Sequence, residues 1–240
     1  MAGLPKLDTP TYQLTVPSTG AKIPYRPYLV KEEKILMMAM ESNDTNQMIG
    51  AVKDVIRACT WVEGSVLDAD TLTMFDIEYI FTQLRAKSVG ETSTIKVKCK
   101  ECEASNEVDV SLEDVRVDVP ETNTKHIKLT DLVGVSLRYP SVESMIKAQA
   151  GDKKSDIDRV FDLIVACIQA IYSGDEIFDA SEQSDKELRE FIESLNTQQF
   201  NEIREFIESI PSAAIEVGFK CTACSHDNKF DVKGLGNFFG

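Results

Sequence analysis

The sequence predicts an α+β protein of two related halves, each ending in a β-hairpin ribbon that carries a Cys-x-x-Cys turn. Three observations point to this fold class. A Lys-Cys-x-x-Cys motif followed by Asn and then Asp-Val occurs twice, at residues 98–110 and 220–232. Alternating apolar residues flank each copy, and apolar residues at helical spacing fill the stretches between them. Because two alternating strands joined by a tight turn favour a hairpin, we expect two ribbons rather than two loose cysteine pairs.

The first half reads as a strand hairpin, three helices and the first ribbon. Alternation around a turn at Gly20 predicts two strands between residues 11 and 26. Pro27 ends the second strand, and acids followed by good helix formers then predict a helix. The three helices that we expect here cover residues 30–40, 48–59 and 72–85.

The second half begins with more alternation over residues 111–140, where we expect strands of a small sheet. Helices follow at residues 142–150 and 155–172, and the second of these opens with a capping box at Ser155. Residues 173–184 are acidic and predict an exposed loop. Two further helices, at residues 184–195 and 200–210, precede Pro211 and the second ribbon.

Three short matches recur in the same order in both halves. Residues 25–27 resemble residues 137–140, residues 54–59 resemble residues 162–167, and the ribbons match, with offsets of 112, 108 and 122 residues. Short apolar helices also look alike by chance, which is the alternative explanation. We interpret the order as a duplication, with a first repeat at 1–117 and a second at 118–240 related by a pseudo-twofold axis.

Net charge, hydropathy and cysteine content limit the classes of function that the chain can have. The formal net charge of −14 disfavours nucleic acid as a partner, because phosphate binding needs clustered Lys and Arg. No apolar run is long enough to span a membrane, and the first residues show no signal pattern, so we expect a chain that stays in a cytoplasm. In that compartment the six cysteines should remain reduced, which favours zinc or burial over disulfides.

The four ribbon cysteines are the candidate metal ligands. If the ribbons face each other, Cys99, Cys102, Cys221 and Cys224 would close one tetrahedral Zn²⁺ site with no open position, which is a structural site. The alternatives are reduced thiols in plain hairpins or two separate incomplete sites. His226 is a possible substitute ligand, although a polar turn residue is the simpler reading.

Thiol chemistry is the competing use of a Cys-x-x-Cys motif. A reactive cysteine of that kind sits at a helix N-terminus, whereas both pairs here lie between predicted strands. Cys59 and Cys167 lie on apolar helix faces, so we expect core thiols. No Gly-rich phosphate loop and no His-Glu pair occurs in the sequence, which therefore gives no catalytic candidate.

Both ends of the chain resemble a known family. Residues 16–20, 25–28 and 30–36, together with 200–211 and the closing Gly234-Leu235 and Phe238-Phe239, resemble the baseplate hub subunits of T-even-like contractile-tailed bacteriophages. The resemblance implies a non-enzymatic structural or assembly component that binds other tail proteins, oligomeric within the assembly. It would be made in the host cytoplasm and belong to the tail baseplate of the virion.

Two further expectations concern partners. Phe238 and Phe239, if exposed, would anchor another protein, because aromatic residues dominate interface energetics. The rival function is a zinc-ribbon regulator that binds nucleic acid, which the acidic charge disfavours, and a thiol oxidoreductase comes after it.

Overall fold

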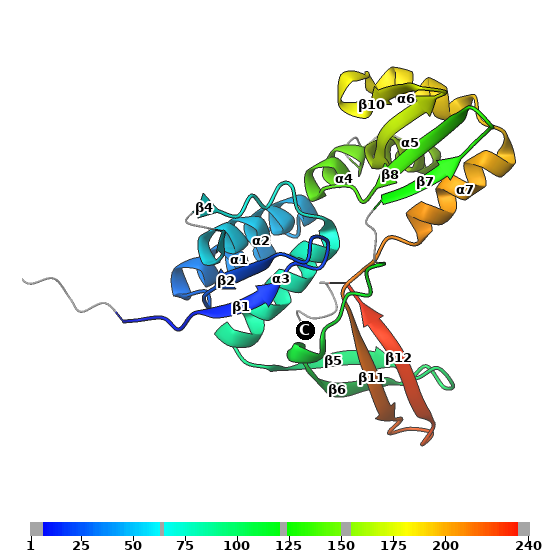
Figure 1. Ribbon diagram of the computed structural model, residues 1–240. Coiled ribbons are helices and arrows are strands. Elements are labelled where there is room, and N and C mark those ends of the chain that lie inside the picture. Colours follow the sequence, from blue (N-terminus) through cyan, green and yellow to red (C-terminus); the bar gives the residue numbers. More distant parts are fainter. Residues whose placement is uncertain (1–6, 63–64, 121–123, 150–154, 235–240) are drawn as a thin grey trace, which may run out of the picture. The chain divides into compact units, whose positions relative to one another are not determined.

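The computed structural model describes residues 7–62, 65–120, 124–149 and 155–234 (Figure 1). Within these residues it has seven α-helices and several small antiparallel sheets, which confirms the α+β fold class. The chain forms two compact units. The first draws its residues from Met1–Ala69, Phe75–Asp118 and Ser212–Gly240, and the second from Asp70–Met74 and Val119–Pro211. No helix in the described part of the chain is both long and apolar enough to cross a membrane.

The first unit opens with the predicted hairpin, β1 (Tyr12–Thr15) and β2 (Lys22–Tyr25), whose turn uses the positive φ of Gly20. Three helices follow, and they are α1 (Val30–Glu41), α2 (Thr45–Cys59) and α3 (Met74–Ser88). Two strands that the sequence did not reveal, β3 (Trp61–Val62) and β4 (Ser65–Val66), are each only two residues long. Strands of that length leave no alternating pattern to detect.

Helix α1 begins at an unusual cap. Its N-cap residue, Leu29, has no side-chain oxygen, so the Glu32 carboxylate accepts the Leu29 backbone N–H at 2.9 Å. The other oxygen of the same carboxylate accepts from the Arg26 guanidinium at 2.9 Å, and Glu32 is only 2% exposed. One buried carboxylate therefore both caps the helix and neutralises Arg26, the residue that follows strand β2.

The two ribbons lie more than a hundred residues apart in sequence and belong to the same unit. The first consists of β5 (Thr92–Lys98) and β6 (Ser105–Ser111), and the second of β11 (Ala214–Lys220) and β12 (Asp227–Lys233). Their inner faces and one residue of α3 share a hydrophobic core, whose buried members include Ala86, Ile95, Val97, Val110, Leu112, Ile215 and Val217. This core packs the two ribbons against each other.

The second unit contains a four-stranded antiparallel sheet in the order β10-β9-β8-β7. Its strands are β7 (Thr124–Lys128), β8 (Val133–Arg138), β9 (Ile168–Ser173) and β10 (Glu176–Asp179). Its helices are α4 (Val142–Gln149), α5 (Asp156–Cys167), α6 (Asp185–Glu193) and α7 (Thr197–Glu208). Leu137, Ile164 and Ile203 are fully buried, so this unit has a core of its own.

The prediction of one helix over residues 155–172 is wrong. The helix ends at Cys167, and Ile168–Ser173 forms strand β9 beside β8. Isoleucines that fit a helical stripe are also β-branched residues suited to a strand, so periodicity alone could not separate the two. Tyr172 pairs with Gly134 of β8 and packs closely against it, since a Cβ at Gly134 would lie 3.0 Å from the tyrosine ring.

Two other expectations also need correction. The acidic stretch 173–184 is exposed as predicted, but it contains strand β10 and a short 3₁₀ turn at Ala180–Glu182 rather than only a loop. In contrast, the alternating valines of residues 115–119 form no strand of a sheet. A 3₁₀ turn at Leu112–Asp114 precedes them, and one isolated bridge joins Arg116 to Ala214.

The two predicted repeats share an order of elements in the described residues. Each has a hairpin, two helices, a second hairpin, further helix and then a ribbon. In the first repeat Tyr25 bridges Thr60, and in the second Leu137 pairs with Ile168. Leu137 lies 112 residues after Tyr25, and Ile168 lies 108 residues after Thr60, so the equivalent partners of the two pairs are offset by two of the values seen in the sequence. The duplication, with repeats at 1–117 and 118–240 related by a pseudo-twofold axis, stays a proposal, and the compact units divide the chain differently.

Candidate metal centre

The tips of the two ribbons have the same backbone design. In the first tip the Cys99 N–H donates to the Ala104 carbonyl at 3.0 Å, and the Glu103 N–H donates back to the Cys99 carbonyl at 3.0 Å. Glu103 adopts a φ of 56°, in the left-handed region. Such a turn brings the second cysteine back towards the first.

The second tip repeats these contacts at equivalent positions. The Cys221 N–H donates to the His226 carbonyl at 2.8 Å, and the Ser225 N–H donates to the Cys221 carbonyl at 2.9 Å. Ser225 has a φ of 61°. Two non-glycine residues in the left-handed region at matching places indicate one knuckle geometry, used twice.

The four ribbon sulfur atoms come together between the tips. Cys99 Sγ lies 3.7 Å from Cys224 Sγ, and Cys102 Sγ lies 3.6 Å from Cys221 Sγ. All four sulfur atoms lie within 4.8 Å of one another. A tetrahedral Zn²⁺ ion with bonds of about 2.3 Å to four thiolates separates the sulfurs by about 3.8 Å. The arrangement therefore fits one four-coordinate metal ion shared by both ribbons.

Two asparagines support the sulfurs from the opposite ribbon. The Asn228 side-chain amide donates to Cys99 Sγ at 3.4 Å, and the Asn106 amide approaches Cys221 Sγ at 3.7 Å. Their side-chain oxygens accept the backbone N–H groups of Lys100 and Thr222, each at 2.9 Å. N–H donors of this kind offset the negative charge that four thiolates leave around one divalent cation. Sequence reasoning did not assign these residues a role, although both follow the second cysteine at equal spacing.

The environment favours thiolate at one cysteine of each pair. Donation from the backbone N–H of Cys224, followed by that of Ala223, lowers the pKa of the Cys221 thiol to about 6. Burial acts to raise the pKa of Cys99, but the backbone N–H groups of Cys102 and Glu101 and the Asn228 amide together lower it. The outer cysteines, Cys102 and Cys224, are exposed, whereas Cys99 and Cys221 are buried.

The other sequence candidates are placed as follows. His226 is not part of the sulfur cluster. Its contribution to the second tip is its backbone carbonyl, which accepts the hydrogen bond from the Cys221 N–H. Cys59 and Cys167 are buried in the two helical cores, as predicted, and burial raises the pKa of their thiols to about 11 and about 12. Phe238 and Phe239 lie outside the described residues.

Comparison with known proteins identifies the family. No curated protein and no solved structure matches the chain. The family described as T4 bacteriophage base plate protein matches residues 9–240, which include both helical regions and all four ribbon cysteines. Because this match covers nearly the whole chain, the protein belongs to the T4 bacteriophage base plate protein family.

Proposed function

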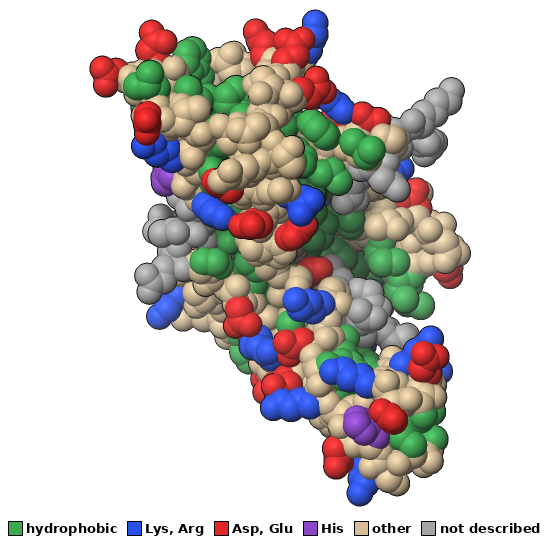
Figure 2. Space-filling model, turned by 90° about the vertical axis from the view of Figure 1, so that its right-hand side faces the viewer, with side chains coloured by type: hydrophobic (Ala, Val, Ile, Leu, Met, Phe, Trp, Pro, Cys, Tyr) green, Lys and Arg blue, Asp and Glu red, His purple; other side chains and the backbone are tan. Residues whose placement is uncertain are grey.

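We propose that the chain is a non-enzymatic structural or assembly component of a phage tail baseplate hub. The family match over residues 9–240 is the observation that carries this proposal. A surface on which acidic side chains are spread among Lys and Arg, as in the face shown in Figure 2, suits a soluble subunit that meets protein partners. The protein would be made in the host cytoplasm, join other hub proteins and form part of an oligomeric assembly in the virion tail.

We further propose that the four ribbon cysteines, Cys99, Cys102, Cys221 and Cys224, hold one structural Zn²⁺ ion. Sulfur contacts of 3.6 and 3.7 Å across the ribbons support this assignment. Four protein ligands leave no position for a substrate or water, so the ion would stabilise the ribbon pair rather than catalyse a reaction. Its role would be to fix the angle between two hairpins whose shared core is small.

Phe238 and Phe239 are the proposed partner anchors. A tagged protein purified from infected cells should bring down other tail proteins, and the double variant Phe238→Ala, Phe239→Ala should recover less of them while folding normally. Phe178→Ala provides a matched control, because Phe178 is an exposed aromatic residue of the second unit. Failure of the unchanged protein to associate with any tail protein during infection would refute the hub role.

A zinc-ribbon regulator that binds nucleic acid is the second candidate function, and the pair of cysteine ribbons is the one feature that favours it. A gel shift at about 50 mM salt tests it, since low salt strengthens any attraction to phosphates. Tight binding under those conditions would favour the regulator, and we expect none.

A further inference from the structure

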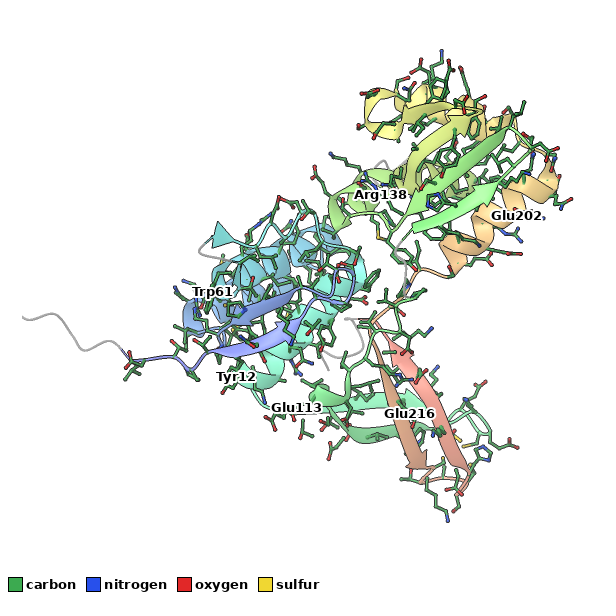
Figure 3. All side chains as sticks on the ribbon, in the orientation of Figure 1. Tyr12, Trp61, Glu113, Arg138, Glu202 and Glu216 are labelled. Carbon is green, nitrogen blue, oxygen red and sulfur yellow. The ribbon has the colours of Figure 1, made fainter. Side chains whose placement is uncertain are left out.

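Two grooves lie along the ribbon pair, one lined by residues of β5 and β12 and the other by residues of β6 and β11. The first, which we call the lysine groove, has a volume of about 400 Å³. It is lined by Ile95, Lys96, Val97, Lys98, Lys100, Phe230, Asp231, Val232 and Lys233. The second, the acidic groove, has a volume of about 180 Å³ and contains Asp109, Asp114 and Glu216, the last of which is labelled on β11 in Figure 3.

The two grooves occupy equivalent positions in the duplicated ribbons. At the ribbon offset of 122 residues, the apolar positions agree, because Val108 corresponds to Phe230 and Val110 to Val232. Of the four lysines in the groove, Lys98 has a lysine at the equivalent position, Lys220, but the other three do not. Lys96, Lys100 and Lys233 correspond to Gly218, Thr222 and Ser111. Since the same hairpin forms with either set, folding of the ribbons does not require these three lysines.

Within the described residues, the positive charges of Lys96 and Lys100 in the lysine groove are poorly neutralised. Its single acid, Asp231, already accepts from the Arg116 guanidinium at 2.8 Å. Lys96 meets Glu107 only at 3.7 Å, and both side chains are well exposed. Lys100 lies over the Phe230 ring, 5.1 Å from its centroid, and donates to the Lys229 carbonyl. A basic groove in a chain with a net charge of −14 is a local exception that suits an anionic ligand.

The walls of the groove are suited to an extended peptide. Strand β5 pairs only with β6, and β12 pairs only with β11, so each has one edge without a strand partner in the described chain. An edge strand presents backbone N–H and C=O groups to an added strand. Phe230 and Val232 are half-buried and provide an apolar floor between the lysines. Each strand has seven residues, which matches an added segment of about seven residues.

We propose that the lysine groove binds an extended acidic segment of a partner protein, which adds as a strand to the edge of β5 or β12. Alternating apolar and acidic side chains would contact the floor and the lysines in turn. A nucleic acid is the less suitable anion, because its phosphates would leave the strand edges and the apolar floor unused. This inference deepens the proposed baseplate function and rests on it only for the choice of a protein partner.

Titration of the purified full chain with a fluorescent heptapeptide of alternating Glu and Val tests the proposal without reference to phage assembly. We expect saturable binding that weakens at least tenfold when salt is raised from about 50 to about 500 mM, because exposed charges are screened. The variant Lys96→Ser, Lys100→Thr, Lys233→Ser should bind at least tenfold more weakly. This variant carries small residues, two of them identical to the residues at the equivalent positions of the other ribbon, and so should keep the fold.

The control variant Lys22→Ser, Lys34→Ser, Lys186→Ser removes the same charge from exposed positions elsewhere and should bind as the unchanged chain does. Two further peptides would carry N-methyl groups on one or the other set of alternate backbone nitrogens. Only one of them should lose binding, because an added strand uses the N–H groups on one of its sides to pair with the groove. Equal binding by both lysine variants, no peptide binding, or tighter binding of a single-stranded oligonucleotide than of the peptide would each overturn the inference. The hub role would then be judged separately by association with tail proteins.

Discussion

The Asn228 side-chain amide donates a hydrogen bond to Cys99 Sγ at 3.4 Å, from one ribbon to the other. The same side chain accepts the Lys100 backbone N–H at 2.9 Å, just inside the first cysteine turn. Asn106 of the first ribbon makes the equivalent contacts to the second ribbon, where its amide approaches Cys221 Sγ and its side-chain oxygen accepts the Thr222 N–H. Each ribbon therefore organises the cysteine turn of the other, so neither half of the candidate metal site is complete alone.

Removal of this support should weaken both the fold and metal binding. We expect Asn228→Ala to lower the free energy of unfolding by about 1–3 kcal/mol, because it leaves the Lys100 N–H without its partner. Zinc affinity should fall by about tenfold to a hundredfold, as for other lost contacts to metal ligands. Urea denaturation and competition with a zinc chelator measure the two effects. Asn46→Ala, which removes an exposed amide on α2, should change stability by less than about 0.5 kcal/mol.

The Glu32 carboxylate should contribute to stability well beyond an ordinary surface acid. Glu32→Gln leaves Arg26 without a charged partner and should lower the free energy of unfolding by about 2 kcal/mol or more. Glu33→Gln, one residue further along the same helix and exposed, should cost less than about 1 kcal/mol. An equal effect of the two substitutions in urea denaturation would contradict the buried pair.

Acid should remove the difference between these two variants. Burial raises the pKa of Glu32, but hydrogen bonds from Arg26 and from the Leu29 N–H outweigh burial and hold it below the ordinary value of 4.5. The stabilisation is therefore present above pH 4.5 and is lost as the pH falls through the folded-state pKa. Stability curves of the unchanged protein and Glu32→Gln should converge below that pH, and a constant gap would be inconsistent with this linkage.

Alkaline pH should destabilise the second unit through its buried thiol. Burial raises the pKa of Cys167 from 9.0 to about 12, so the folded state keeps a proton that the unfolded chain loses between these values. Stability should therefore fall as pH rises above 9. Cys167→Ala removes this contribution, and its urea midpoint should decline less steeply between pH 9 and 10.5. The packing lost in Cys167→Ala lowers stability by an amount that does not vary with pH. Parallel declines of the two urea midpoints with pH would therefore contradict the contribution of the buried thiol.

The compact units predict which fragment folds alone. Residues 119–211 contain the four-stranded sheet and α4 to α7, so this fragment should unfold cooperatively on heating. Residues 1–117 lack β11 and β12, whose Ile215 and Val217 complete the core under Ile95 and Val97, and should be far less stable. Circular dichroism melts compare the two fragments. A stable 1–117 and an unfolded 119–211 would contradict the division into these units.

The sequence predicted the elements whose signals are local. The Cys-x-x-Cys turns, the Gly20 hairpin and the capping box at Ser155 are all where the pattern placed them. The strand β9 was missed because Ile168 and Ile171 satisfy a helical stripe and a strand equally well, and only pairing with β8 decides between them. The type of each of these elements was therefore predictable, except at β9, where the apolar pattern fits both a helix and a strand and tertiary contacts decide between them.

The sequence predicted that the four cysteine sulfurs come together, but not the side chains that contact them. Cysteine spacing indicated the four sulfurs, and the duplicated motif suggested that the ribbons meet. The crossed contacts of Asn106 and Asn228 depend on the packing of two hairpins and could not be derived from either motif alone. The same holds for the lysine groove, whose residues come from β5 and β12 and share a surface only after folding.

Metal analysis with X-ray absorption spectroscopy tests the central claim most directly. For protein purified without chelators, we predict about one zinc per chain with four sulfur neighbours at about 2.3 Å, and loss of the metal in Cys102→Ser, Cys224→Ser. A metal-free chain, or zinc bound by a mixture of nitrogen and sulfur atoms, would contradict a single ion shared by the two ribbons.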